Sequence, residues 1–336
     1  MRVRAFAHVG GIAWCAGIAA GIGLTLWSGI DEVGRAIASV GAGMALVVLV
    51  RIATVGIAGA GWWLLLPVGT PLRLPPALLL RFVREAVNTL LPLTQIGGDI
   101  VGARVATFWG IAGALAAASI IVDVLVQAVT QLLFAVLGLA TLVALGVHTT
   151  VTWMAAAGLA LSIPALGGFY FVQRRSGQRI LQFLLTRLKG DSNWRVLGTV
   201  DAVYQSLSAI YARRSRLAAS TAVHLAGWLV GTAEIWIVFH WMGHPLSISE
   251  ALVIESLIQA VRGAAFMIPS ALGAQEAGLI LLCGIFGIAP EQALALSLIK
   301  RAADLMIGVP GLIALQVLEG GRLKARGEND VPSESR

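Results

Sequence analysis

The sequence predicts an all-α, polytopic integral membrane protein with six full spans and two re-entrant helical hairpins, arranged as an inverted repeat. Three observations indicate this fold. Charged residues make up 12% of the chain, which is about half their share in soluble globular proteins. Several apolar stretches are long enough for a helix to cross a bilayer, which takes roughly 20 residues. Two other stretches are broken by proline and glycine, so that each half is too short to cross alone.

Long runs of hydrophobic residues mark the expected spans. A β-barrel also satisfies backbone polar groups in lipid, but its strands would alternate over roughly 10 residues, and the sequence lacks that alternation. We interpret the first span, which follows Arg2 and Arg4, as a retained anchor, because its apolar core is too long for a cleaved signal sequence. The expected spans are residues 9–29, 41–67, 112–146, 150–173, 217–241 and 292–318.

The two broken stretches, 76–110 and 250–286, contain similar turns. They read Pro-Leu-Thr-Gln-Ile-Gly-Gly-Asp at 92–99 and Pro-Ser-Ala-Leu-Gly-Ala-Gln-Glu at 269–276, so each begins with proline and ends on a carboxylate. Broken helices in corresponding positions of two halves are typical of duplicated transporters. We therefore predict a single membrane domain, 1–336, with repeat one at 41–146 and repeat two at 217–318.

The distribution of lysine and arginine predicts the orientation. These residues gather in the segment 174–216 and near both termini, which the positive-inside rule places in the cytoplasm. Hairpin 76–110 then enters from the cytoplasm and hairpin 250–286 from outside, so the repeats are inverted. The net charge of +7 follows from this pattern and needs no nucleic-acid partner. Residues 319–336 are expected to form a disordered cytoplasmic tail.

The segment 174–216 has amphipathic spacing as well as basic residues. Leu197, Val200, Tyr204 and Leu207 share one helical face, which is the pattern of a helix lying on a membrane surface. We expect this segment to rest on the inner leaflet and to hold anionic headgroups. A linker that serves topology alone is the alternative.

Charged residues also recur inside the predicted membrane region. Each costs roughly 2.5–3.5 kcal/mol at the bilayer centre, whereas a typical fold is stable by about 5–15 kcal/mol. They must therefore pair, face water or lie near the interface, and their near balance of sign favours pairing around an internal polar cavity. They are Arg51, Arg81, Arg84, Arg104, Arg262, Lys300 and Arg301, with Glu85, Asp99, Asp123, Glu234, Glu250, Glu255, Glu276 and Asp304.

The two turns supply the candidate binding site. Asp99 and Glu276 each begin a returning half-helix, where a carboxylate also caps free N–H groups, so capping is the alternative to substrate binding. Arginines on the entering half-helices suit an anionic headgroup, and charge balance is their alternative. Asp123 and Asp304 are candidates for proton or sodium coupling. The candidate substrate-binding residues are Arg81, Arg84, Asn88, Gln95, Gly97, Gly98, Asp99, Arg104, Arg262, Gln275 and Glu276.

We expect both tips to line a pocket at mid-membrane, with an apolar gap open to the bilayer. No phosphate-binding loop, zinc-protease motif, nucleophile elbow or Cys/His cluster is found. The chain is therefore expected not to be an enzyme and to need neither cofactor nor metal. Gly17 and Gly21 have the spacing that lets two helices pack closely, and a homodimer is left open.

The two turn motifs resemble those of the lysylphosphatidylglycerol synthase/flippase transmembrane family. The residues that carry the resemblance are Asn88-Thr-Leu-Leu-Pro-Leu-Thr-Gln-Ile-Gly-Gly-Asp99 with Arg104, and Ile268-Pro-Ser-Ala-Leu-Gly-Ala-Gln-Glu276 followed by Ser297-Leu-Ile-Lys-Arg301. The first is most similar to the hopanoid-associated, HpnL-like branch. The resemblance covers most of residues 10–318. It implies a lipid translocase in the bacterial inner membrane, without the aminoacyl-transferase activity of the synthases.

Our first hypothesis is a transporter or flippase that moves a hopanoid or a related polar-headed lipid across or out of the inner membrane, with membrane lipids as its partners. A flippase for an anionic or aminoacylated phospholipid, or for a polyprenyl-linked lipid, is a close alternative. A non-transporting scaffold for lipid-modifying enzymes is an alternative of another class. Charged turns at mid-membrane favour transport, because a scaffold does not need them.

Overall fold

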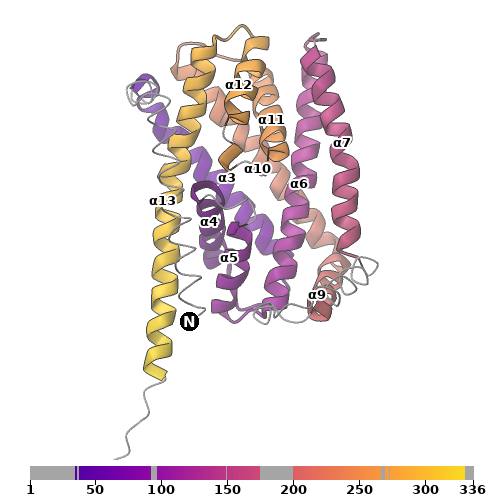
Figure 1. Ribbon diagram of the computed structural model, residues 1–336, viewed down its shortest axis with the longest axis vertical. Helices are drawn as coiled ribbons and strands as arrows, with labels where there is room; N and C mark the ends of the chain where they lie inside the picture. Colours follow the sequence, from indigo (N-terminus) through magenta and orange to yellow (C-terminus); the bar gives the residue numbers. More distant parts are fainter. Residues whose placement is uncertain are drawn as a thin grey trace, which may run out of the picture.

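The chain is all-helical in the computed structural model (Figure 1), and no strand occurs among the residues described. The described residues are 35, 38–91, 97–148, 150–174, 200–265, 269–271 and 273–329. The expected span 9–29 and most of the segment 174–216 lie outside them.

Five helices are long and apolar enough to cross a membrane, and they coincide with the other five spans expected from the sequence. The span prediction is therefore confirmed for these helices, and the chain is a multi-pass membrane protein. They are α3 (Gly43–Leu65), α6 (Gly113–Ala144), α7 (Thr150–Val172), α10 (Arg214–Trp241) and α13 (Pro290–Asn329).

Helix α13 corrects one boundary. It was expected to leave the membrane near residue 318 and to continue as a disordered tail, but it stays helical to Asn329. Glu319 on this helix pairs with Arg104, which ties the extension to the helical bundle. Residues 330–336 lie outside the described part of the chain.

Two pairs of shorter helices occupy the broken stretches. At 1.5 Å per residue, helices of 17 residues or fewer fall short of a hydrocarbon core of about 30 Å. Each therefore has the length of a half-helix, as the sequence predicts. They are α4 (Leu74–Leu90) with α5 (Gly97–Ala106), and α11 (Ile248–Ala264) with α12 (Ala274–Ile285).

Local sequence explains where these helices begin and turn. Prolines occupy the first positions of α4, where a missing N–H costs nothing. Ser247 and Glu250 form a reciprocal capping box at the start of α11, which satisfies two backbone donors. In the second turn, Ser270 and Ala271 both have positive φ, a backbone conformation that is uncommon outside glycine. That short 3₁₀ turn (η3, Pro269–Ala271) joins the two half-helices.

Helix contacts of the same kind occur in both parts of the chain that were predicted to be repeats. Helices α3 and α10 pack on each other, α4 packs on α13, and α11 packs on α6, while α5 and α12 each contact the long helix that follows them. Figure 1 shows α11 and α12 toward one end of the bundle and α4 and α5 toward the other half. Glycines allow close approach at both equivalent interfaces, Gly138 against Ser256 and Gly311 against Phe82.

The buried apolar residues form two clusters. One gathers around α11 and α12 with α3, α10 and α13, and the other lies around α4, α5 and α6. Helix α9 (Val200–Ala212) belongs to the second cluster, where it buries Tyr204, Leu207 and Ile210. Its predicted amphipathic face is confirmed, but that face is covered by protein, chiefly by α6.

We predict that α9 and the loop after α10 lie on opposite sides of the membrane. Helix α10 has 28 residues, about 42 Å of rise, so its two ends cannot share one side if it crosses. In a background with Cys15→Ala and Cys283→Ala, Ser208→Cys should react with an impermeant maleimide from the cytoplasm and Pro245→Cys from outside. Labelling of both positions from one side would show that α10 does not span.

Candidate functional site

The first charged cluster is built around the guanidinium of Arg84, which is fully buried on α4. Its Nη2 lies 2.7 Å from Asp99 Oδ1 on α5 and 2.8 Å from Asp123 Oδ2 on α6. The Trp62 ring on α3 lies 5.3 Å from the guanidinium carbon. One side chain therefore joins the half-helices of the first hairpin to two of the long helices.

Asp123 is the second centre of this cluster, and it is also fully buried. Besides Arg84, it meets Arg81 Nη1 at 3.9 Å, and it accepts a hydrogen bond from Gln127 at 2.9 Å. His224 on α10 places its Nε2 3.0 Å from Asp123 Oδ1. Arg81 also pairs with Glu85, one turn along α4, at 3.2 Å.

The start of α5 fits closely against α4. The backbone N–H of Gly98 donates to Asn88 Oδ1 at 2.7 Å, so Asn88 satisfies a free donor of the first turn of α5. A Cβ at Gly98 would lie 2.1 Å from the carbonyl oxygen of Arg84, closer than any real contact. Asn88 thus has a positioning role at the first turn, and the carboxylate of Asp99 is directed to Arg84.

The second charged cluster is built around Lys300, fully buried on α13. Its Nζ lies 2.9 Å from Glu255 on α11 and 3.3 Å from Glu234 on α10. Arg51 on α3 pairs with Glu234 at 2.9 Å and lies 3.4 Å from Asp304 on α13. Arg51 and Glu234 thus neutralise each other.

Glu276 at the second turn both caps its half-helix and forms an ion pair. Its Oε2 accepts from the N–H of Gly273 at 2.7 Å, and its Oε1 lies 2.6 Å from Arg301 Nη2. Ser297 donates to Oε1 at 2.8 Å and accepts from Gln275 at the same distance. Glu276 is thus held by α13, as Asp99 is held by α4.

The two clusters use equivalent helices with opposite signs. In the first hairpin, the cation Arg84 on α4 meets the carboxylate Asp123 on α6. In the second, the carboxylate Glu255 on α11 meets the cation Lys300 on α13. Helices α4 and α11 are thus each joined to a long helix, α6 or α13, by a buried ion pair.

The other predicted site residues lie outside these clusters or at their edge. Arg104 is exposed and pairs with Glu319 at 2.8 Å, so it does not join the buried network. Arg262, near the end of α11, is half-buried and has no hydrogen bond or ion pair among the described residues. Gly97 is the first residue of α5. Gln95 lies outside the described part of the chain.

The second turn contacts the end of α4. Ser270 in the second turn donates to the carbonyl oxygen of Thr89 at the end of α4, at 2.7 Å. A cavity of about 350 Å³ lies between α6, α7, α9 and α10, and a smaller one lies near the start of α4. Neither cavity lies between the tips, so the expected pocket at that position stays a prediction.

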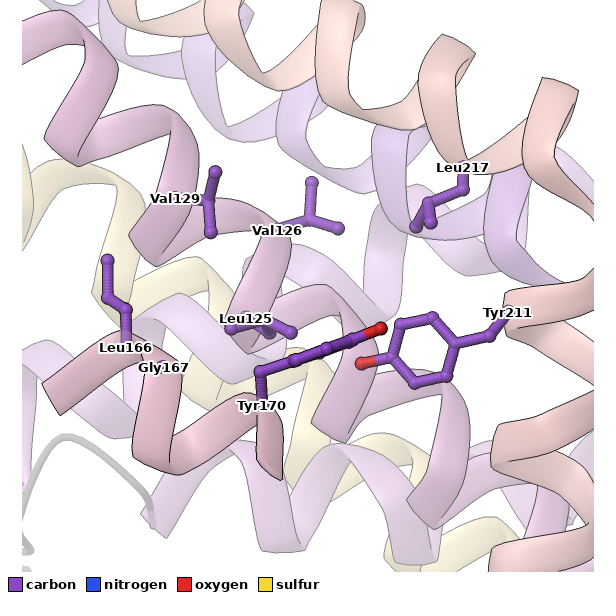
Figure 2. Close-up of a pocket in the computed structure, with 8 residues that line it drawn as sticks. All are labelled: Leu125, Val126, Val129, Leu166, Gly167, Tyr170, Tyr211 and Leu217. Carbon is purple, nitrogen blue, oxygen red and sulfur yellow. The ribbon is translucent and has the colours of Figure 1, made fainter. Parts of the chain in front are cut away.

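The larger cavity is almost entirely apolar (Figure 2). Leucines and valines of α6, α7 and α10 form its walls, and the hydroxyls of Tyr170 and Tyr211 point toward one another at one end. The Arg174 guanidinium lies 4.7 Å from the Tyr170 ring and 5.4 Å from the Tyr211 ring. Burial raises the pKa of the Tyr211 phenol to about 12. The cavity therefore has apolar walls with a polar, cationic end.

Residues 14–311 match the family model of the lysylphosphatidylglycerol synthase TM region. The chain belongs to this family. Searches of curated proteins and of solved structures give no match. The buried charged clusters therefore belong to a membrane protein whose family suggests a lipid-related function.

Sequence reasoning missed His224 as a member of the first cluster. Its signal was a single histidine near the middle of an apolar span, but its partner lies about one hundred residues away in sequence. Sequence reasoning also left the partner of Glu276 open. Arg301 on the next long helix supplies it, and Arg262 on the preceding half-helix does not.

We predict that Asp123→Ala destabilises the protein strongly, because it removes the fully buried carboxylate that Arg84, Arg81 and His224 share. Loss of one member of a buried pair costs about 3–5 kcal/mol. The matched control is Arg104→Ala, which breaks an exposed pair worth about 0–1 kcal/mol. Thermal unfolding of both variants in detergent measures the difference, and equal midpoints would contradict the role of the buried cluster.

We predict that Gly98→Ala displaces α5 from α4 and lowers stability, because its Cβ would overlap the Arg84 carbonyl oxygen. The control is Gly284→Ala on α12, where nothing lies within 4 Å of the added carbon. That change should be neutral or stabilise by about 0.5–1 kcal/mol, as alanine favours helices. Unfolding in detergent distinguishes them, and tolerance of Gly98→Ala would refute the close fit.

Proposed function

We propose that the chain is a lipid transporter of the bacterial inner membrane that moves a hopanoid or a related polar-headed lipid between leaflets or out of that membrane. The observation that carries this proposal is the pair of broken half-helices, each held to a long helix by buried ions. A charge in the membrane interior costs free energy, and a protein with a purely structural task has no need of it.

The packing supports an inverted repeat of two re-entrant hairpins. The contacts of α4 with α5 and α13 correspond to those of α11 with α12 and α6. Buried ion pairs also join α4 to α6 and α11 to α13. In Figure 1 the two helix pairs lie toward opposite ends of the bundle. With basic residues on the cytoplasmic side, both termini face inward, the first hairpin enters from the cytoplasm and the second enters from outside.

A polar headgroup would move along the paired charges. Asp99 and Glu276 each contact a single guanidinium near a turn, so a headgroup that offers hydrogen bonds can replace part of those contacts. Arg262 is half-buried and has no described partner, which suits it to hold an anionic group. Asp123 and Asp304, each paired to arginine within the bundle, are the candidates for coupling to an ion gradient.

The lipid tail needs an apolar path beside this polar one. The cavity between α6, α7, α9 and α10 has apolar walls and a volume of about 350 Å³. This volume is comparable to that of the smaller ligand pockets of proteins. The exposed apolar face of α7, with Leu161, Ile163 and Phe171, lies beside it. The basic segment 174–216, which follows α7, would meet anionic headgroups of the inner leaflet.

The same proposal assigns no chemical step to the chain. In this proposal the chain carries lipid without enzyme activity, cofactor or metal. A homodimer stays a prediction. Phospholipids with anionic or aminoacylated heads and polyprenyl-linked lipids share the required chemistry, a polar head on apolar tails. They are therefore tested in parallel with the hopanoid.

We predict that the double variant Asp99→Asn, Glu276→Gln loses at least about tenfold in transport rate while remaining folded. The assay uses proteoliposomes with fluorescent phosphatidylglycerol, quenched by impermeant dithionite, and a polyol-headed hopanoid, oxidised by impermeant periodate. Arg104→Gln, whose pair is exposed, is the control and should transport normally.

The outcomes separate the alternatives. A wild-type rate in the folded double variant would leave capping and ion pairing as the whole role of the two carboxylates. No transport of either probe by the wild-type protein would favour the scaffold hypothesis over the transporter.

A further inference from the structure

His224 is a buried histidine in a span, and its ring has a fixed position. It lies near the middle of α10 and is 3% exposed. On α3, a Cβ at Gly61 would lie 2.6 Å from its Nε2, so the glycine makes room for the ring. The ring is thus held between α3 and α6, with one nitrogen directed at Asp123.

The geometry divides the Asp123 carboxylate between two kinds of cation. Oδ1 faces His224 Nε2 at 3.0 Å, whereas Oδ2 faces Arg84 at 2.8 Å and Arg81 at 3.9 Å. An ionised carboxylate accepts hydrogen bonds and cannot donate them, so Nε2 carries a hydrogen. The second nitrogen, Nδ1, is therefore the one that gains a proton when the ring becomes charged.

The charges of the cluster leave room for that proton. Its guanidinium groups are Arg81 and Arg84, and its carboxylates are Glu85, Asp99 and Asp123. With a neutral imidazole the cluster has one negative charge in excess, and a protonated His224 removes the excess. Because an unbalanced charge is costly away from water, the charged ring is a favourable member of this group.

No other element packed against α10 supplies the missing charge to the ring. Among the described residues, α3 presents Gly61 to it, and α9, α11 and α13 form no ion pair with it. The second cluster, around Lys300, contains no histidine among its described members. Histidine is the side-chain type that most often exchanges a proton near neutral pH, and His224 is the histidine among the described members of these clusters.

We propose that His224 and Asp123 form a proton-binding site that sets how firmly Arg84 is held, and so couple lipid movement to the proton gradient. When the proton is bound, the imidazolium neutralises Asp123 and Arg84 is free to exchange Asp99 for a headgroup. When the proton leaves, the guanidinium groups are the only charged partners of Asp123 in this cluster, and Asp123 retains Arg84. The coupling step rests on the proposed lipid transport, whereas the proton site itself does not.

The first experiment tests the proton site without transport. The thermal unfolding midpoint of the full chain in detergent is measured from pH 6 to 8.5 for wild type, His224→Gln and His148→Gln. A proton bound at the proposed site would be lost from the folded protein as pH rises, so the wild-type midpoint should fall by about 3 °C. His224→Gln should be flat with pH, and His148→Gln, at an exposed position, should follow the wild type.

A second variant guards against a general folding defect. His224→Asn is compared with His224→Gln, and each must elute as a single species in gel filtration before its pH profile is measured. A pH-dependent midpoint that persists in a folded His224 variant would overturn the proton site. A flat profile in the wild type would overturn it equally.

The second experiment tests the coupling. Proteoliposomes of phosphatidylcholine and phosphatidylglycerol contain fluorescent phosphatidylglycerol, and a pH gradient of either direction is imposed with sodium or with choline as the cation. Wild-type transport should differ severalfold between the two directions and be the same in both cations, and His224→Gln should lose the difference. Gradient-independent or sodium-dependent wild-type transport would overturn proton coupling, and absence of any wild-type transport would instead overturn the proposed function.

Discussion

The structure depends on one constraint, that each charge in the interior of the helical bundle has a partner close enough to replace water. Arg84 and Lys300 satisfy it in the same way, since each is fully buried and meets two carboxylates from different helices. Such pairs add little net stability compared with apolar packing, yet removing one partner is costly. They therefore specify which helices are neighbours more than they strengthen the fold.

The exchange of sign between the halves shows what the equivalent positions require. A cation on α4 and a carboxylate on α6 in one half correspond to a carboxylate on α11 and a cation on α13 in the other. The interaction between half-helix and long helix is shared, but the residue types are not. If the two halves are repeats, as the sequence predicts, they share a backbone arrangement and a need for neutrality, which paired charges can meet in either polarity.

The sequence predicted the helices well because hydrophobic length and Pro/Gly breaks are local properties. It predicted the five described spans and both pairs of half-helices. It did not assign Arg301 to Glu276, include His224, or place the apolar cavity beside α7. Each of these depends on how separate helices pack, and charge balance alone allowed several pairings. The extension of α13 to Asn329 was missed because the polar residues of its last turns are typical of a disordered tail.

A network that holds its charges tightly must also let them move if lipid is to pass. The sharing of Arg84 between Asp99 and Asp123 resolves this conflict. When a headgroup displaces Asp99, Arg84 keeps its contact with Asp123, so the guanidinium never lies unpaired in the membrane interior. An isolated pair would have to lose all its electrostatic stabilisation before a ligand could enter, at a cost of several kcal/mol. In the proposed transport cycle, shared carboxylates thus lower the barrier to exchange, and the proposed proton on the imidazole beside Asp123 would shift the balance between holding and release.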